Sequence, residues 1–191
     1  AAGVGHTYQD TTINVLLSVL REQCVETREH ASRLDAYCHL LGLHFQLASE
    51  EMEELSLLAV LHDIGKMGVN PAILKKPAPL TSKEWIEMKR HSEIGWRIVK
   101  GFPDLGAVAN YILFQHERWA GKGYPSGLKA DNIPLPSRIL AVADAYDAMT
   151  SDRVYRKSMA KEEAIAELTK NAGMQFDPQV VSLFNKTIID L

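Results

Sequence analysis

The segment SEEMEELSLLAVLHDIGK, residues 49–66, decides the fold class of this chain. Ser49 followed by two glutamates is typical of the cap and the acidic first turn of a helix. The leucines that follow recur at spacings of three, which places them on one helical face. We therefore expect a helix that ends near Gly65 and presents His62 and Asp63 at its C-terminal end.

The same helical periodicity runs through most of the chain. Apolar residues at spacings of three and four predict one long helix over 13–41, stopped at Gly42. Thr81 and Glu84 have the spacing of a capping box and open a helix that ends at His91. Further helices are expected over 104–116, 137–149, 160–172 and 178–189.

No stretch alternates in the manner of a strand, so the expected fold class is all-α, a bundle of about seven helices. A long Gly/Pro-rich segment, 121–136, separates two of the helices, and an irregular loop of this length in a compact domain is usually functional. The length of 191 residues fits one domain. We assign residues 1–12 to a connector or a cloning remnant and residues 13–191 to the domain.

Composition narrows the class of protein. Hydrophobic residues make up 46% and charged residues 24%, the mix of a soluble globular protein. The formal charge of -3 argues against binding a nucleic-acid polymer, because that requires a basic surface. No run approaches the roughly 18 apolar residues of a membrane span, so no membrane insertion is expected. Cys24 and Cys38 lie too far apart along one helix to pair, which predicts reduced thiols and a cytoplasmic chain.

Histidines and carboxylates recur at the expected helix ends. His62 and Asp63 are adjacent and can bind one divalent ion together, although an isolated pair of this kind is more often structural. His91 and His116 end two other helices, and Asp144 interrupts the apolar run ILAVADAYDAM. Taken together, these residues predict a metal centre.

Simpler interpretations exist for single residues. A buried carboxylate at Asp144 must be paired or coordinate a metal, so an ion pair with Arg138 explains it as well as a metal does. Glu26 and His30 stand four residues apart on one helical face, where they also fit a solvent-exposed pair. The number of potential ligands favours the metal centre.

Three motifs carry a resemblance to a known family: HDIGK at 62–66, HERWAGKGYP at 116–125 and ADAYDAMTSDRVYR at 143–156. Through them the chain resembles the HD-GYP branch of the HD-domain phosphohydrolases, which degrade the bacterial signalling messenger cyclic di-GMP. The resemblance implies the HD-domain helical bundle and a metal-dependent phosphodiesterase. The implied reaction is hydrolysis of cyclic di-GMP to pGpG, GMP or both.

The resemblance also implies roles for individual residues. Asp63 would bridge two ions and act in catalysis with Lys66, and Glu26 would be the extra ligand of members that hold a third ion. The implied metal ligands are Glu26, His30, His62, Asp63, His91, His116 and Asp144. The implied substrate-binding residues are Lys66, Tyr124, Asp147, Arg153 and Arg156.

The chemistry of these side chains suits that reaction. Two ions roughly 3.5 to 4 Å apart lower the pKa of a bridging water, so that hydroxide attacks the phosphodiester in line. Histidine and carboxylate ligands suit Fe, Mn or Ni, and Zn as well. The planar guanidinium groups of Arg153 and Arg156 can each donate two hydrogen bonds to phosphate oxygens. The alternative interpretation is that they only form a solvent-exposed basic surface. The loop with Tyr124 would cover the substrate pocket. The alternative interpretation is that this loop is only a surface turn.

Two positions depart from the family pattern. Gln115 stands where the family usually has a ligand histidine, and a neutral amide is the weaker donor. Ala120 stands where an aspartate usually supports the loop. Both favour an alternative, a partly degenerate module that binds a cyclic dinucleotide or a partner protein with little catalysis. A second alternative, an HD-type hydrolase of another nucleotide, leaves the GYP-like loop unexplained.

The expected small-molecule partner is a cyclic dinucleotide. The segment 9–20 resembles a connector helix that pairs protomers into a homodimer, and an upstream sensor or receiver domain would precede it in a longer protein.

Overall fold

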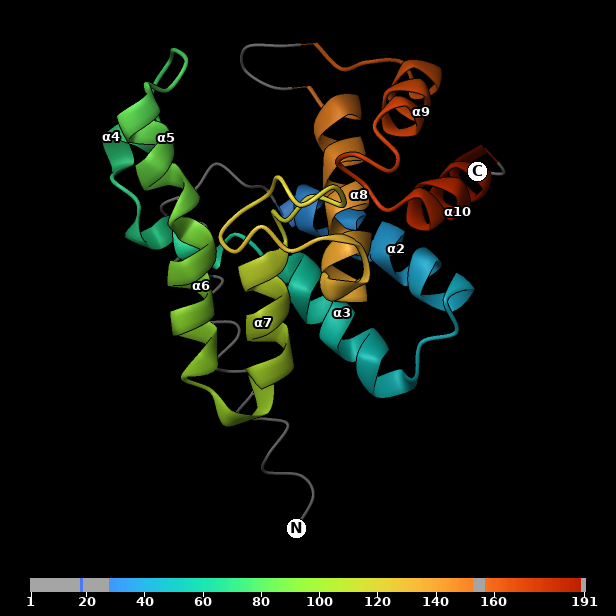
Figure 1. Ribbon diagram of the computed structural model, residues 1–191, viewed down its shortest axis with the longest axis horizontal. Coiled ribbons are helices and arrows are strands. Elements are labelled where there is room, and N and C mark those ends of the chain that lie inside the picture. The colour runs from blue at the N-terminus through green and yellow to red at the C-terminus, as the bar shows by residue number, and fades with distance from the viewer. Residues whose placement is uncertain (1–17, 19–27, 153–156, 190–191) are drawn as a thin grey trace.

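Helices make up nearly all of the regular structure (Figure 1). The computed structural model describes residue 18, residues 28–152 and residues 157–189. Over these residues it contains isolated bridges but no strand, which confirms the all-α expectation. The elements are α2 (Arg28–His44), α3 (Ser49–Leu61), η1 (Ile64–Gly68), α4 (Pro71–Leu74), α5 (Ser82–Lys89), α6 (His91–Lys100), η2 (Pro103–Leu105), α7 (Gly106–Phe114), η3 (Ala130–Asn132), α8 (Leu135–Thr150), α9 (Lys161–Lys170) and α10 (Pro178–Ile189).

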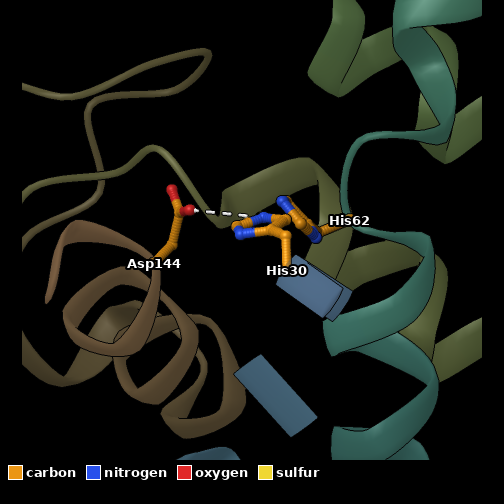
Figure 2. Close-up of side chains that lie close together, drawn as sticks. All are labelled: His30, His62 and Asp144. Carbon is orange, nitrogen blue, oxygen red and sulfur yellow. Dashed lines mark ion pairs between the residues drawn. The ribbon is translucent and has the colours of Figure 1, made fainter. Parts of the chain in front are cut away.

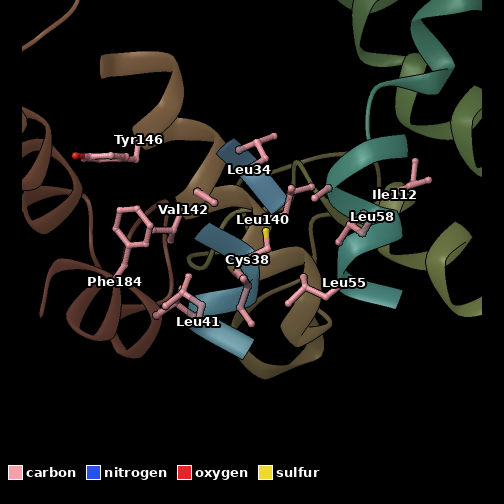
Figure 3. Close-up of a cluster of buried hydrophobic side chains, with 14 of the residues drawn as sticks. Leu34, Cys38, Leu41, Leu55, Leu58, Ile112, Leu140, Val142, Tyr146 and Phe184 are labelled. Atoms are coloured by element: carbon pink, nitrogen blue, oxygen red, sulfur yellow. The ribbon is translucent and has the colours of Figure 1, made fainter. Parts of the chain in front are cut away.

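The core lies where α2 packs against α3, α8 and α10 (Figure 3). Its members come from the apolar faces of these helices and are almost fully shielded from water. Helix α7 packs on the other side of α3, and α6 packs against α7 and η1, so that α3 lies between the core helices and the α6–α7 pair. The labelled core residues are Leu34, Cys38, Leu41, Leu55, Leu58, Ile112, Leu140, Val142, Tyr146 and Phe184. In the part of the chain that is described, no helix combines the length and the apolar character that crossing a membrane requires.

The end of α2 differs from the expectation. The helix does not stop at Gly42 but continues to His44, and Gln46 takes the left-handed conformation with φ 55°. The amides of Gln46 and Leu47 then donate to the carbonyls of Leu43 and Gly42, as in a Schellman motif. Gly42 has another role, because a Cβ there would overlap the sulfur of Met52. Apart from Ser18, residues 13–27 of the helix expected over 13–41 lie outside the described residues, as do residues 1–12.

The helix that opens at Thr81 ends earlier than expected. The capping box is confirmed: Thr81 Oγ1 accepts from the Glu84 amide at 3.3 Å, and the Glu84 carboxylate accepts from the Thr81 amide at 2.7 Å. However, α5 ends at Lys89, and His91 is the first residue of α6 rather than the last of α5. Ser49 was expected to be the N-cap of α3, but Ser49 is the first residue of the helix and Ala48 is the N-cap.

Gly65 brings the segment after α3 into direct contact with α6. A Cβ at this position would overlap the main-chain oxygen of His91 and lie 2.5 Å from the amide nitrogen of Gly95. Both atoms belong to the main chain, so neither can turn aside as a side chain can. The glycine of HDIGK therefore lets His62 and Asp63 approach His91.

We predict that Gly65→Ala destabilises the fold by at least about 1–3 kcal/mol, the usual cost of overpacking a dense interior. Gly106→Ala is the matched control, because a Cβ at Gly106 meets nothing within 4 Å and its φ of -59° is helical. This control should stabilise by about 0.4–1 kcal/mol. Urea unfolding curves of the two variants measure both effects, and equal midpoints would contradict the close approach.

Candidate metal centre

Six side chains with metal-binding atoms gather where α2, α6, α8 and the ends of α3 and α7 meet. They form two groups, and in each group the ligand atoms lie within 4.8 Å of one another. The first group is His30, His62 and Asp144, and the second is Asp63, His91 and His116.

In the first group, His30 and Asp144 face each other from α2 and α8 (Figure 2). His30 Nε2 lies 3.8 Å from Asp144 Oδ1, and the ring centroids of His30 and His62 are 5.7 Å apart. His62 Nδ1 donates to the main-chain oxygen of Ala59 at 3.0 Å. Because a carbonyl only accepts, Nδ1 carries the proton, and Nε2 of the neutral ring carries the lone pair that a metal needs.

In the second group, the rings of His91 and His116 point at each other with their Nε2 atoms 2.9 Å apart. His91 Nδ1 donates to the main-chain oxygen of Met88 at 2.6 Å, which fixes the same tautomer as in His62. Two nitrogens that bind one ion at about 2.1 Å and at right angles lie about 3 Å apart. The spacing of the two histidines fits a pair of ligands to one ion.

Burial keeps the two histidines of the second group in the neutral state that binds metals. It lowers the pKa of His91, although the charge of Asp63 opposes the shift. Burial, reinforced by the nearby His91, lowers the pKa of His116 to about 3. Since only the neutral imidazole coordinates a metal, both rings are ready ligands at neutral pH.

The two oxygens of Asp63 face different groups. Asp63 Oδ2 lies 3.1 Å from His62 Nε2, and Oδ1 lies 3.7 Å from His91 Nε2. Lys66 Nζ lies 2.5 Å from Oδ2, one helical turn along the chain. The carboxylate belongs to the second group and also reaches His62 of the first group, as a shared ligand would. Imidazole nitrogens and carboxylate oxygens together suit divalent transition metals.

Asp147 was expected to bind substrate, but its side chain is buried and bonded to other residues of the chain. Its side chain is only 2% exposed and accepts hydrogen bonds from His30 Nδ1 at 2.7 Å and from Arg33, which reaches both carboxylate oxygens. Burial alone would raise the pKa of Asp147, but the hydrogen bonds from His30 and Arg33 outweigh it and hold the pKa at about 2. The geometry makes this carboxylate a support for His30.

Gln115 also has a partner that the sequence did not suggest. Its side chain is buried, and Nε2 donates to the main-chain oxygen of His62 at 2.6 Å. The amide nitrogen therefore faces the main chain beside a candidate ligand. Gln115 thus supports the position of His62, in addition to standing where the family usually has a histidine.

The loop that contains Tyr124 is fixed against the end of α7. The Tyr124 amide donates to the His116 carbonyl at 3.2 Å, and the Ser126 amide donates to Glu117 Oε1 at 2.7 Å. Gly123 allows this approach, since a Cβ there would overlap the main chain of Glu117. As a result the rings of Tyr124 and His116 stack with centroids 4.9 Å apart. The loop places Tyr124 at the edge of the second group.

Arg138 does not pair with Asp144. It binds Asp177 at 2.6 Å and Asp131 at 3.1 Å, so the ion pair considered for Asp144 is wrong. Nor is Asp144 fully buried as expected, because 34% of its side chain is exposed. At the other departure from the family pattern, the Ala120 amide donates to the Met174 carbonyl at 2.9 Å, so a main-chain bond holds the start of the loop.

Three expected site residues, Glu26, Arg153 and Arg156, lie outside the described residues, and their roles stay predictions. Sequence reasoning missed Arg33. The available signal was its position three residues after His30, which puts the two side chains on one helical face.

Comparison with known proteins identifies the family of this chain. The family described as HD domain matches residues 14–180. A cyclic di-GMP phosphodiesterase of Thermotoga maritima is 39% identical over 184 residues, which cover 94% of this chain and 50% of that protein. A 3'3'-cGAMP-specific phosphodiesterase of Vibrio cholerae is 35% identical over 88% of this chain and 33% of that protein. The chain spans half or less of the length of these relatives.

Solved structures show the same fold. A cyclic GMP-AMP-specific phosphodiesterase of V. cholerae superposes with a TM-score of 0.66 at 22% identity, over 93% of this chain and 47% of that chain. The HD domain of the L. monocytogenes phosphodiesterase PgpH gives 0.65 at 16% identity, over 92% of this chain and 95% of that chain. The helical arrangement, the family match over 14–180 and the histidine–aspartate centre agree: this chain belongs to the HD-domain family.

Proposed function

We propose that this chain is a metal-dependent phosphodiesterase that hydrolyses cyclic di-GMP to pGpG, GMP or both. One observation carries the proposal: the carboxylate of Asp63 lies between two groups of ligand atoms, with one oxygen toward each. A shared carboxylate can hold two ions at the separation of roughly 3.5–4 Å that two-metal hydrolases use. The relatives named cyclic di-GMP phosphodiesterases support the choice of substrate.

We assign one divalent ion to each group, with Asp63 shared between them; with two or three ions in total, Glu26 would be the extra ligand of the third. Fe, Mn and Ni suit the histidine and carboxylate donors best, and Zn suits them as well. When bound, such ions would supply Lewis-acid activation of water and stabilisation of charge on the phosphodiester.

The side chains around the ligands complete the proposed site. Lys66 is held at Asp63, where its ammonium group would face the negative charge that develops on the phosphodiester. The Tyr124 ring, stacked on His116, would limit how the dinucleotide enters. Arg153 and Arg156 would bind phosphate oxygens through their planar guanidinium groups.

A second substrate has specific support. Relatives in V. cholerae are named 3'3'-cGAMP-specific phosphodiesterases, and one is 35% identical over 170 residues. This molecule has the same type of phosphodiester ring and differs from cyclic di-GMP in one base. The same centre would hydrolyse both, so the choice between them depends on contacts to the base.

The remaining proposals concern the whole protein. We propose a cytoplasmic enzyme that dimerises through the segment 9–20 and is controlled by an upstream sensor or receiver domain. Its matched relatives extend well beyond the part that this chain covers, which supports the presence of further domains.

The proposed activity predicts that protein loaded with Fe or Mn under reducing conditions converts cyclic di-GMP to linear products. Chromatography of the nucleotides measures the conversion, with 3'3'-cGAMP and cyclic di-AMP in parallel. Absence of linear product with Fe, Mn, Ni and Zn, while a relative is active in the same assay, would refute the activity.

The proposed shared ligand predicts that Asp63→Asn lowers metal affinity by more than about 100-fold, beyond the 10- to 100-fold typical of residues that only support a ligand. Asp104→Asn is the matched control, because Asp104 is an exposed aspartate within η2. Calorimetric titration of metal-free protein with Mn²⁺ measures the affinity. Equal affinity in the two variants would contradict the assignment of Asp63.

Substitution at Gln115 and Ala120 can distinguish an active enzyme from a module that only binds its ligand. We expect the unaltered chain to hydrolyse substrate, and the double variant Gln115→His, Ala120→Asp to bind metal about 10-fold more tightly, because an imidazole is the better donor. Nucleotide chromatography and metal titration of both proteins measure this. Substrate binding without turnover in the unaltered chain, with turnover restored in the double variant, would favour the binding module.

A further inference from the structure

We infer that Arg33 is a positioning residue of the metal centre, which acts through Asp147 to fix the direction of the His30 ring. The inference rests on the proposed function only in taking His30 as a metal ligand.

Arg33 and His30 lie one turn apart on α2, and both reach Asp147 on α8. Arg33 donates through Nε to Asp147 Oδ1 and through a terminal nitrogen to Oδ2, the latter at 3.0 Å. His30 Nδ1 lies 2.7 Å from the same Oδ2. Three N–H groups thus converge on one carboxylate that is 2% exposed.

The hydrogen bond from His30 to Asp147 sets which nitrogen of the ring is available to a metal. Because a carboxylate only accepts, Nδ1 carries the proton, and Nε2 faces Asp144, 3.8 Å away. Arg33 bonds to both oxygens of the same carboxylate and so holds the acceptor of His30 in place.

The fork of Arg33 also fixes orientation. Bonds to both oxygens prevent the Asp147 carboxylate from rotating, and a further bond from Arg33 to Ser151 Oγ at 3.0 Å ties the guanidinium group to the end of α8. The Ser151 amide in turn donates to the Asp147 carbonyl at 2.9 Å. A lysine would supply the charge but not this planar geometry.

The test compares Arg33→Met, Arg33→Lys and Asp147→Asn with the control Arg97→Met. Arg97 is an exposed arginine on α6, the helix that begins with His91. Metal-free proteins are titrated with Mn²⁺ by calorimetry, and circular dichroism reports whether each variant is folded. Turnover of cyclic di-GMP gives kcat and KM separately.

We expect Arg33→Met to weaken ion binding about 10- to 100-fold, the range typical of groups that orient a ligand histidine, with kcat lowered and KM retained. Arg33→Lys should recover part of the affinity, and Arg97→Met should behave as the unaltered chain. The double variant Arg33→Met, Asp147→Asn should bind no more weakly than Asp147→Asn alone, because the two residues act as one unit.

Two results would overturn the inference: Arg33→Met binding Mn²⁺ as tightly as the unaltered chain, or effects of Arg33→Met and Asp147→Asn that simply add. If Arg33→Met does not fold, Arg33→Lys and Ser151→Ala carry the test, and full affinity in both would count against it. If the unaltered chain binds ions but hydrolyses no cyclic dinucleotide, the proposed function is refuted. The comparison of Mn²⁺ affinities still tests the role of Arg33 in that case. Normal hydrolysis with unaffected binding in Arg33→Met refutes the inference alone.

Discussion

The arrangement of the centre depends on where each histidine ring places its proton. His62 and His91 both donate Nδ1–H to the carbonyl three residues earlier, Ala59 in the last turn of α3 and Met88 in the last turn of α5. Carbonyls in the last turn of a helix are the ones that have no partner farther along the same helix. The helix ends therefore supply acceptors that fix the tautomer, and the Nε2 lone pairs face inward. His30 reaches the same state differently, through the carboxylate of Asp147.

This constraint works only if the main-chain segments lie close together. The contact of Gly65 with the main chain of His91 brings the end of α3 onto the start of α6. The hydrogen bond from Gln115 to the His62 carbonyl joins the end of α7 to the same place. Three helix boundaries thus meet at the centre, while the apolar faces of these helices pack behind them. The packing that builds the core thus also places the candidate ligands.

Local patterns were enough to predict much of the fold. The helix at 178–189 follows from its periodicity, and the capping box of Thr81 and Glu84 formed as its spacing predicts. The boundary at His91 was missed because Arg90 keeps a helical backbone conformation, with no glycine or proline to mark the change. The end of α2 was misplaced because Gln46 takes the left-handed position that usually signals itself by a glycine.

The candidate ligands could be predicted from the sequence, but the hydrogen bonds that hold them in place could not. Periodicity and motif spacing brought His62, Asp63, His91, His116 and Asp144 forward, and the structure gathers them in two groups. The pairing of Arg33 with Asp147 links positions 114 residues apart, and no local pattern encodes such a contact. The same holds for the bond between Gln115 and the carbonyl of His62, 53 residues away.

The bond from Gln115 to His62 has an evolutionary consequence. Glutamine and histidine codons differ only in their final letter, so one base substitution separates this centre from one with an additional imidazole. That substitution would replace the hydrogen bond that holds the His62 carbonyl with an imidazole, so an added metal donor would come with the loss of a support for His62. The residue at position 115 therefore couples the number of metal donors to the placement of an existing one.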